Sequence, residues 1–289
     1  EITPKMKLYK INTGYFKLDG GAMFGVVPKV IWQKTNPADE NNLCSWAMRC
    51  LLIDTGDRKI LIDNGIGEKQ SKKFYSHYFL HGDDTMIKSL AAHGFTPDDI
   101  TDNILTHLHF DHAGGGIKKK DDGDGYGPVF KNATYWVSKS QWDWAMNPNG
   151  REKASFMDEN LLPMQEYGQL KFIEEETELY PDIFLRIFDG HTKGQIIPQI
   201  NFNGRTLVYM ADLLPSTGHI PLSYIMSYDT KPLVTLEEKI KFMEEAVENK
   251  YTLYFEHDYY TECCSLKRTE RGVRHDKSFS LEQFVTNNF

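Results

Sequence analysis

Short apolar runs rich in β-branched and aromatic residues recur along this chain and predict a protein in which strands outnumber helices. Two of them lie on either side of Gly56 in RCLLIDTGDRKILIDNG, which predicts a β-hairpin. Six further runs are predicted to be strands: NILTHL, ATYWVS, IFLRIFDG, IPQINFNG, RTLVYMAD and YTLYFEH.

Two segments have the apolar spacing of short helices. Residues 84–93 place Ile87, Leu90 and Ala91 on one stripe, and Gly94 follows as an end signal. The sequence QWDWAM predicts a second helix.

A third helix is predicted around Thr235 and Glu238, which have the spacing of a capping box. Its predicted apolar face consists of Leu236, Ile240, Met243 and Val247. With strands in the majority, these elements predict an α/β fold, an αββα sandwich of two mixed β-sheets with helices on the outer faces.

No repeat or low-complexity linker divides the 289 residues, so a single domain over residues 1–289 is expected. The two most loop-like stretches are residues 33–43 and the run KKKDDGDGYGP at 118–128, which predicts a solvated excursion.

Charge and cysteine content narrow the classes of partner. The 33 Lys and Arg against 41 Asp and Glu give a net charge of −8, which disfavours nucleic acid as a partner. No stretch approaches the roughly 18 apolar residues of a membrane span. The four cysteines are too few and too irregular for a disulfide framework, so reduced or buried thiols are expected.

The chain begins at Glu1 rather than Met. A cytoplasmic location is expected, with a periplasmic or secreted protein after removal of a signal peptide as the alternative.

The stretch ILTHLHFDHAGG concentrates metal-type ligands. In an extended segment His107 and His109 share a face, so both imidazoles can bind one ion. Asp111 and His112 follow, where a turn allowed by Gly114–Gly116 can direct them to a second ion. A metal site is therefore predicted here, and further ligands should come from other strand ends.

Three other predicted strands end on such a residue: IFLRIFDG at His191, RTLVYMAD at Asp212 and YTLYFEH at His257. A carboxylate such as Asp212 can bridge two ions in a two-metal arrangement.

The ordered set H-x-H-x-D-H, His, Asp, His resembles the metallo-β-lactamase superfamily. By that resemblance Asp212 would bridge two divalent metal ions, and Asp63 in ILIDNG would support the ligands from behind. Zinc is the first expectation, although manganese, iron or cobalt would suit the same ligands. The first ion would be held by His107, His109 and His191, and the second by Asp111, His112 and His257.

Within that superfamily LTHLHFDHAGG and DGGAMFGVVPK look like the N-acyl homoserine lactonase branch and its organophosphate-hydrolysing relatives. The resemblance implies a small-molecule lactone as substrate. Met23, Phe24 and Trp32, with Phe110 beside the metals, are predicted to line a groove for the acyl chain. The alternative for the segment around Met23 is packing into the core.

Two bound ions would lower the pKa of a bridging water and polarise the lactone carbonyl, and Asp111 or Asp212 would carry the proton onward. Known lactonases have a tyrosine three residues after the bridging aspartate, where this chain has Pro215. His219 is the predicted replacement donor to the substrate, with Tyr224 next.

Two other functions compete with the lactonase. A phosphotriesterase or arylesterase would use the same metals with a more aromatic pocket, and a non-hydrolytic metal-binding protein is the third alternative. The sequence leaves the oligomeric state open, a homodimer included.

Overall fold

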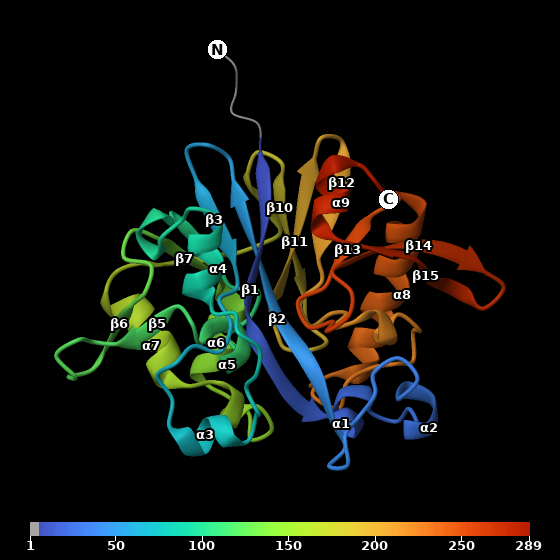
Figure 1. Ribbon diagram of the computed structural model, residues 1–289, viewed down its shortest axis with the longest axis horizontal. Helices are drawn as coiled ribbons and strands as arrows, with labels where there is room; N and C mark the ends of the chain where they lie inside the picture. Colours follow the sequence, from blue (N-terminus) through green and yellow to red (C-terminus); the bar gives the residue numbers. More distant parts are fainter. Residues whose placement is uncertain (1–5) are drawn as a thin grey trace. The chain divides into compact units, whose positions relative to one another are not determined.

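The computed structural model describes residues 6–289, which form two compact units (Figure 1). The first unit contains the described residues up to Gly14 together with Met48–Glu175. The second contains Tyr15–Ala47 together with Glu176–Phe289. Strands β1 (Lys7–Asp19) and β2 (Leu43–Asp54) contribute residues to both.

A mixed sheet with the strand order β1-β2-β3-β4-β7-β8 forms the framework of the first unit. The hairpin predicted around Gly56 is confirmed, since β2 pairs antiparallel with β3. From β3 onward each strand runs parallel to the next, so these strands end at one edge. Their bounds are β3 (Lys59–Ile62), β4 (Asp102–Ile104), β7 (Thr134–Ser138) and β8 (Leu170–Ile173).

Short helices and a small hairpin complete the first unit. Part of the stretch 118–128 is a hairpin rather than plain loop, because β5 pairs with β6 on either side of an exposed tip. The helices are α3 (Lys72–Ser76), α4 (Met86–Ala92), α5 (Phe110–Ala113), α6 (Lys139–Met146) and α7 (Asp158–Glu166), and the hairpin strands are β5 (Ile117–Lys119) and β6 (Tyr126–Pro128).

The apolar stripe predicted for residues 84–93, which contain helix α4, is partly wrong. Helix α4 buries Met86, Ser89 and Leu90, while Ile87 is exposed. The Ser89 hydroxyl donates to the Asn12 carbonyl, so a polar contact rotates the inward face away from Ile87. Both α4 and α6 lie where the sequence predicted helices.

The second unit is built on a mixed sheet with the order β15-β14-β13-β12-β11-β10-β9. Its four predicted strands are confirmed as β10 to β13. The full set is β9 (Thr177–Tyr180), β10 (Ile183–Phe188), β11 (Gln195–Phe202), β12 (Arg205–Tyr209), β13 (Thr252–Tyr254), β14 (Cys263–Thr269) and β15 (Gly272–Phe279).

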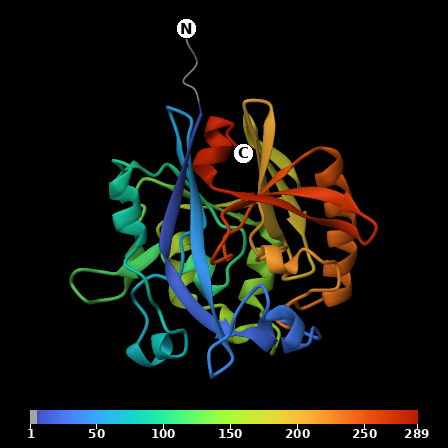
Figure 2. The same ribbon diagram turned by 45° about the vertical axis from the view of Figure 1, so that its right-hand side comes forward.

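Helices of this unit precede, interrupt and follow its strands in the chain. The 17-residue helix α8 (Pro232–Glu248) packs against β14 and β15. The short helices α1 (Gly20–Phe24) and α2 (Lys29–Trp32), blue in Figure 2, contact each other. Helix α9 (Leu281–Thr286) follows the last strand. Mixed sheets accompanied by helices agree with the predicted fold class.

The capping box predicted for α8 is wrong, and the predicted apolar face is partly wrong, since Met243 is buried but Ile240 is exposed. The helix begins at Pro232, so Thr235 lies inside it, and Glu238 accepts from the backbone of Asp189 and Gly190 instead. Ile240 faces solvent while Lys239 is buried, because carbonyl groups beneath the helix accept hydrogen bonds from the Lys239 ammonium. The buried face consists of Thr235, Lys239, Phe242, Met243 and Ala246.

All four cysteines are free and buried, as expected. Within residues 6–289 no helix has the length and apolar character needed to cross a membrane.

Candidate metal centre

In the first unit the predicted ligands and their predicted supporting residue, Asp63, lie beyond the carboxyl ends of two neighbouring parallel strands. Asp63 follows β3, and His107 to His112 follow β4, so the parallel pairing brings both segments to one edge. Strand β4 ends at Ile104, and His109 is the N-cap of α5. The prediction that His107 and His109 share a strand face is therefore wrong.

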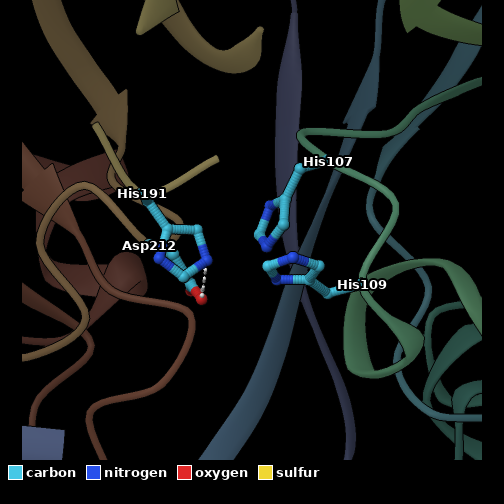
Figure 3. A group of neighbouring side chains, drawn as sticks. All are labelled: His107, His109, His191 and Asp212. Carbon is cyan, nitrogen blue, oxygen red and sulfur yellow. Dashed lines mark ion pairs between the residues drawn. The ribbon is translucent and has the colours of Figure 1, made fainter. Parts of the chain in front are cut away.

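The three histidines of this segment are nevertheless close together. The ring centroid of His107 lies 4.6 Å from that of His109 and 4.0 Å from that of His112. Figure 3 shows the rings of His107 and His109 next to each other. All three side chains are buried. Burial of three imidazoles costs free energy unless other groups form hydrogen bonds with their ring nitrogens.

The Asp63 carboxylate fixes His112 directly and His107 through the Thr106 hydroxyl. The carboxylate accepts from the backbone and hydroxyl of Thr106, both at 2.7 Å, and from His112 Nδ1 at 2.9 Å. Because the Thr106 hydroxyl proton is used on Asp63, that oxygen must accept from His107 Nδ1, 3.0 Å away. In both rings these contacts use Nδ1, so Nε2 is the nitrogen that can serve as a ligand atom.

His109 is held by a residue that the sequence analysis missed. Its Nε2 lies 2.9 Å from Glu152 Oε1, and Trp144 and Asn149 donate to the other oxygen of that carboxylate. Glu152 lies in an irregular segment, so no periodicity marks it.

The glycines after His112 serve close packing. A Cβ on Gly115 would lie 2.0 Å from the Asn64 carbonyl oxygen, and one on Gly114 would lie 2.2 Å from that of Ile66. None of Gly114, Gly115 and Gly116 has a positive φ. The prediction that they provide a special turn conformation is wrong: the space taken by the Asn64–Ile66 backbone requires glycine here.

In the second unit His191, Asp212 and His257 lie at one edge of the seven-stranded sheet. Strands β10 and β12 are each antiparallel to β11, and β12 is parallel to β13, so all three point the same way. The three residues follow the ends of β10, β12 and β13.

Asp212 lies between two imidazoles of its own unit. One carboxylate oxygen is 3.1 Å from His191 Nε2, which Figure 3 marks as a dashed line, and the other is 3.0 Å from His257 Nε2. The Gln195 amide oxygen accepts from the Asp212 backbone N–H at 2.9 Å and fixes its position. One buried carboxylate therefore addresses two different histidines with its two oxygens.

The Nδ1 atoms of His191 and His257 also form hydrogen bonds. His191 Nδ1 donates to Asp229 at 2.7 Å, and His257 Nδ1 donates to the Ala47 carbonyl at 2.7 Å. Burial opposes protonation of His191, but the carboxylates of Asp212 and Asp229 outweigh it and raise its pKa to about 10. The negative charge around His191 Nε2 thus favours a positive charge there, which a proton or a metal ion can provide.

These contacts fit a metal centre. Every predicted histidine ligand is held through one ring nitrogen, so the other can serve as the ligand atom, and the remaining donors are carboxylate oxygens. Imidazole and carboxylate donors suit a divalent transition ion. Among the described residues the candidate ligand groups include all seven predicted ligands: His107, His109, Asp111, His112, His191, Asp212 and His257.

The residues predicted to line an acyl groove are packed inside the second unit. Met23, Phe24 and Trp32 are no more than 2% exposed, and Phe24 stacks on Trp32 with ring centroids 5.3 Å apart. Core packing therefore accounts for these side chains. The exposed apolar members of the same segment are instead Val26, Val30 and Ile31.

His219 is buried, and both of its ring nitrogens have partners in the chain. Nε2 lies 2.7 Å from the Met23 carbonyl and must be the donor, so Nδ1 accepts from the Ser216 hydroxyl at 2.7 Å. Its ring stacks on Phe24 with centroids 4.3 Å apart. Donation to a substrate carbonyl would require the contact with Met23 to be given up.

The two remaining predicted contacts are half-buried. Phe110 packs against Phe74 and Tyr78, with centroids 5.3 Å and 4.9 Å away. Tyr224 lies in a turn in which its backbone N–H donates to the Pro221 carbonyl.

The family profile described as the metallo-beta-lactamase superfamily matches residues 49–247, well over half of the chain. The chain belongs to the metallo-beta-lactamase superfamily. It is a metal-dependent hydrolase of that superfamily.

Individual relatives agree with this assignment. The N-acyl homoserine lactonase AiiA of Bacillus thuringiensis subsp. kurstaki is 28% identical over 198 residues, which cover 65% of this chain and 67% of the relative. A crystal structure of a probable metal-dependent hydrolase from Staphylococcus aureus is 30% identical, covers 98% of this chain and 99% of that one, and has a TM-score of 0.87. The metallo-β-lactamase fold expected from the sequence is confirmed.

A third structure, the dizinc quorum-quenching lactonase AidC in complex with its product, shares the fold. It is 23% identical with a TM-score of 0.78, over 96% of this chain and 97% of the other.

Proposed function

We propose that this metal-dependent hydrolase has a dinuclear centre and opens the lactone ring of N-acyl homoserine lactones. The observation that carries the dinuclear centre is the Asp212 carboxylate, whose two oxygens each lie within 3.1 Å of a different buried imidazole. A bridging ligand needs this two-sided arrangement. The lactone substrate rests on the resemblance to the lactonase relatives.

His107, His109 and His191 would hold one ion, Asp111, His112 and His257 the other, and Asp212 would bridge them. Bound divalent ions would supply an activated water nucleophile at neutral pH and a Lewis acid for the ester carbonyl.

The chain's own residues would set the orientation of the ligands and take up the proton. Asp63, Glu152 and Asp229 would keep the ligand nitrogens aimed and raise their basicity, as supporting carboxylates do in other metal sites. Asp111 lies 3.4 Å from His112 Nε2 and is the least buried of the proposed ligands, so it is placed to pass a proton to solvent.

An amphiphilic substrate is supported by aromatic residues next to the ligand segment. Phe110 immediately precedes Asp111 and forms a half-buried group with Phe74 and Tyr78. An acyl chain packed on such a group would gain up to about 0.8 kcal/mol per buried methylene.

A substrate panel tests the proposal. The purified enzyme, loaded with zinc, is assayed on N-acyl homoserine lactones of increasing chain length, paraoxon, an aryl ester and nitrocefin. We expect kcat/KM to rise from short to medium acyl chains and to exceed that for paraoxon at least tenfold.

The variant Phe110→Ala should flatten the chain-length dependence more than it slows an unsubstituted lactone. Phe184→Ala, at an exposed position on β10, is the matched control. A faster reaction with paraoxon or the aryl ester would replace the lactonase with the phosphotriesterase or arylesterase alternative.

A further inference from the structure

Lys239 is a buried cation on the inward face of α8. Its side chain is 2% exposed, and its ammonium donates to the carbonyls of His219, Pro221 and Tyr224 at 2.8, 3.0 and 3.0 Å. An ammonium has three donors, so these three acceptors satisfy it completely. A core position normally takes an apolar side chain, because burial of a charge is costly without such compensation.

The three carbonyls belong to one segment, residues 213–230, that connects two parts of the proposed metal centre. The segment begins directly after Asp212 and contains Asp229, whose carboxylate holds His191. It includes few residues of regular structure, and its backbone is held by short turns and by contacts with other segments, such as Ser227 N–H with the Ala22 carbonyl. The contacts with α8 add to these.

Helix α8 makes a second contact with the same segment, one turn before Lys239. The hydroxyl of Thr235 donates to Asp229 Oδ2 at 2.8 Å, while Asp229 Oδ1 accepts from His191. Residues four apart lie on one face of a helix, so a single face of α8 holds both halves of the segment.

We propose that Lys239 and Thr235 are positioning residues: α8 uses them to fix segment 213–230, and through it the orientation of Asp212 and of the Asp229–His191 pair. The inference rests on the proposed metal centre. Helix α8 contains no proposed ligand, and its role in this inference is to keep the ligands in place.

The first test compares metal release. Lys239→Met keeps a long side chain but removes all three hydrogen bonds, and Lys241→Met is the matched control on the solvent side of the same helix. Proteins loaded with zinc are mixed with a chromogenic chelator. Loss of supporting contacts around a metal site typically costs 10- to 100-fold in affinity, so we expect Lys239→Met to release zinc at least tenfold faster. Lys241→Met should stay within twofold of the parent.

A second arm separates positioning from general destabilisation. Thr235→Val removes only the hydroxyl contact to Asp229 and keeps the ammonium, so it tests the inference even where Lys239→Met fails to fold. We expect faster zinc release, an altered visible spectrum of the cobalt-substituted protein and a lower kcat at nearly constant KM. Lys239→Arg, which keeps a cation with several donors, should recover part of the loss.

The outcomes distinguish this inference from the proposed function. A parent enzyme that retains no zinc would overturn the metal centre and this inference with it. A parent that retains zinc, with release rates and cobalt spectra unchanged in both Lys239→Met and Thr235→Val, would overturn the positioning role alone.

Discussion

At the scale of single residues, Asp212 is a buried carboxylate that lies close to two histidines. Its two oxygens lie 3.1 and 3.0 Å from imidazole nitrogens of His191 and His257. A bridging role makes the negative charge more important than the shape of the side chain, because one anion would hold two cations.

We therefore expect Asp212→Asn to bind less metal and to lose orders of magnitude in kcat. Elemental analysis of the purified variant and a lactone assay measure both effects. Asp121→Asn is the control, since the side chain of Asp121 is 96% exposed. Full activity with two ions bound in Asp212→Asn would contradict the bridging role.

His219 makes a prediction about pH. Burial, the largest effect, lowers the pKa of His219 to about 3 from its ordinary 6.5, against a raising contribution from the Met23 carbonyl. Above pH 6.5 the ring is neutral in both folded and unfolded chains. Below it the unfolded chain takes up a proton that the folded chain refuses, so the free energy of unfolding should fall as pH drops from 6.5 towards 3.

We expect His219→Phe, which retains a ring to stack on Phe24, to be less stable at pH 7.5 but to lose less stability on acidification to pH 5. Urea unfolding at the two pH values measures the difference. His77→Phe, at an exposed position, controls for removal of a histidine from the surface. Equal pH dependence in His219→Phe and the parent would show that His219 does not contribute to acid sensitivity.

At the scale of elements, backbone segments approach each other closely where the ligand loop meets the loop after β3. The carbonyl of Asn64 occupies the place where a side chain on Gly115 would begin, 2.0 Å from a Cβ. The Asn64 side chain also accepts from the Gly115 N–H at 2.8 Å. The two loops are thus locked by a position where only glycine fits.

Gly115→Ala should push these loops apart and lower the free energy of unfolding by roughly 1–3 kcal/mol, the usual cost of overpacking. Gly150→Ala is the matched control, because a Cβ there meets nothing within 4 Å. Urea unfolding gives the stability, and metal analysis shows whether displacement of the loop also weakens the ligands that precede it. A Gly115→Ala protein as stable as Gly150→Ala would contradict the steric account.

At the scale of the whole molecule, bound metal should stabilise the folded chain, since the proposed ligands come from segments far apart in sequence. A ligand that binds only the folded state at 100 times its dissociation constant adds about 2.7 kcal/mol. Removal of metal with a chelator should therefore lower the melting temperature, and added zinc should restore it. Calorimetry of the metal-free and reloaded protein measures the shift. Identical melting temperatures would speak against a metal centre that spans these segments.

The sequence by itself determined the strands and the residues at their ends. Strand positions could be predicted because apolar and β-branched residues encode extended structure locally, as in β10 to β13. Polar residues that follow those runs could be selected as ligand candidates, because a histidine or carboxylate at a strand end contributes little to the apolar core. These residues are His191, Asp212 and His257. The helical faces were less well determined, since inward polar contacts override apolar periodicity.

Only the tertiary structure decided which groups hold the ligands. Glu152 lies 43 residues from His109, Asp229 lies 38 residues from His191, and the Ala47 carbonyl lies 210 residues from His257. No local pattern marks such partners, because a hydrogen bond depends on where the chain folds back and not on the residues beside it. For the same reason the inward direction of Lys239 could not be predicted, since the three carbonyls that make its burial tolerable lie 15 to 20 residues earlier in the chain.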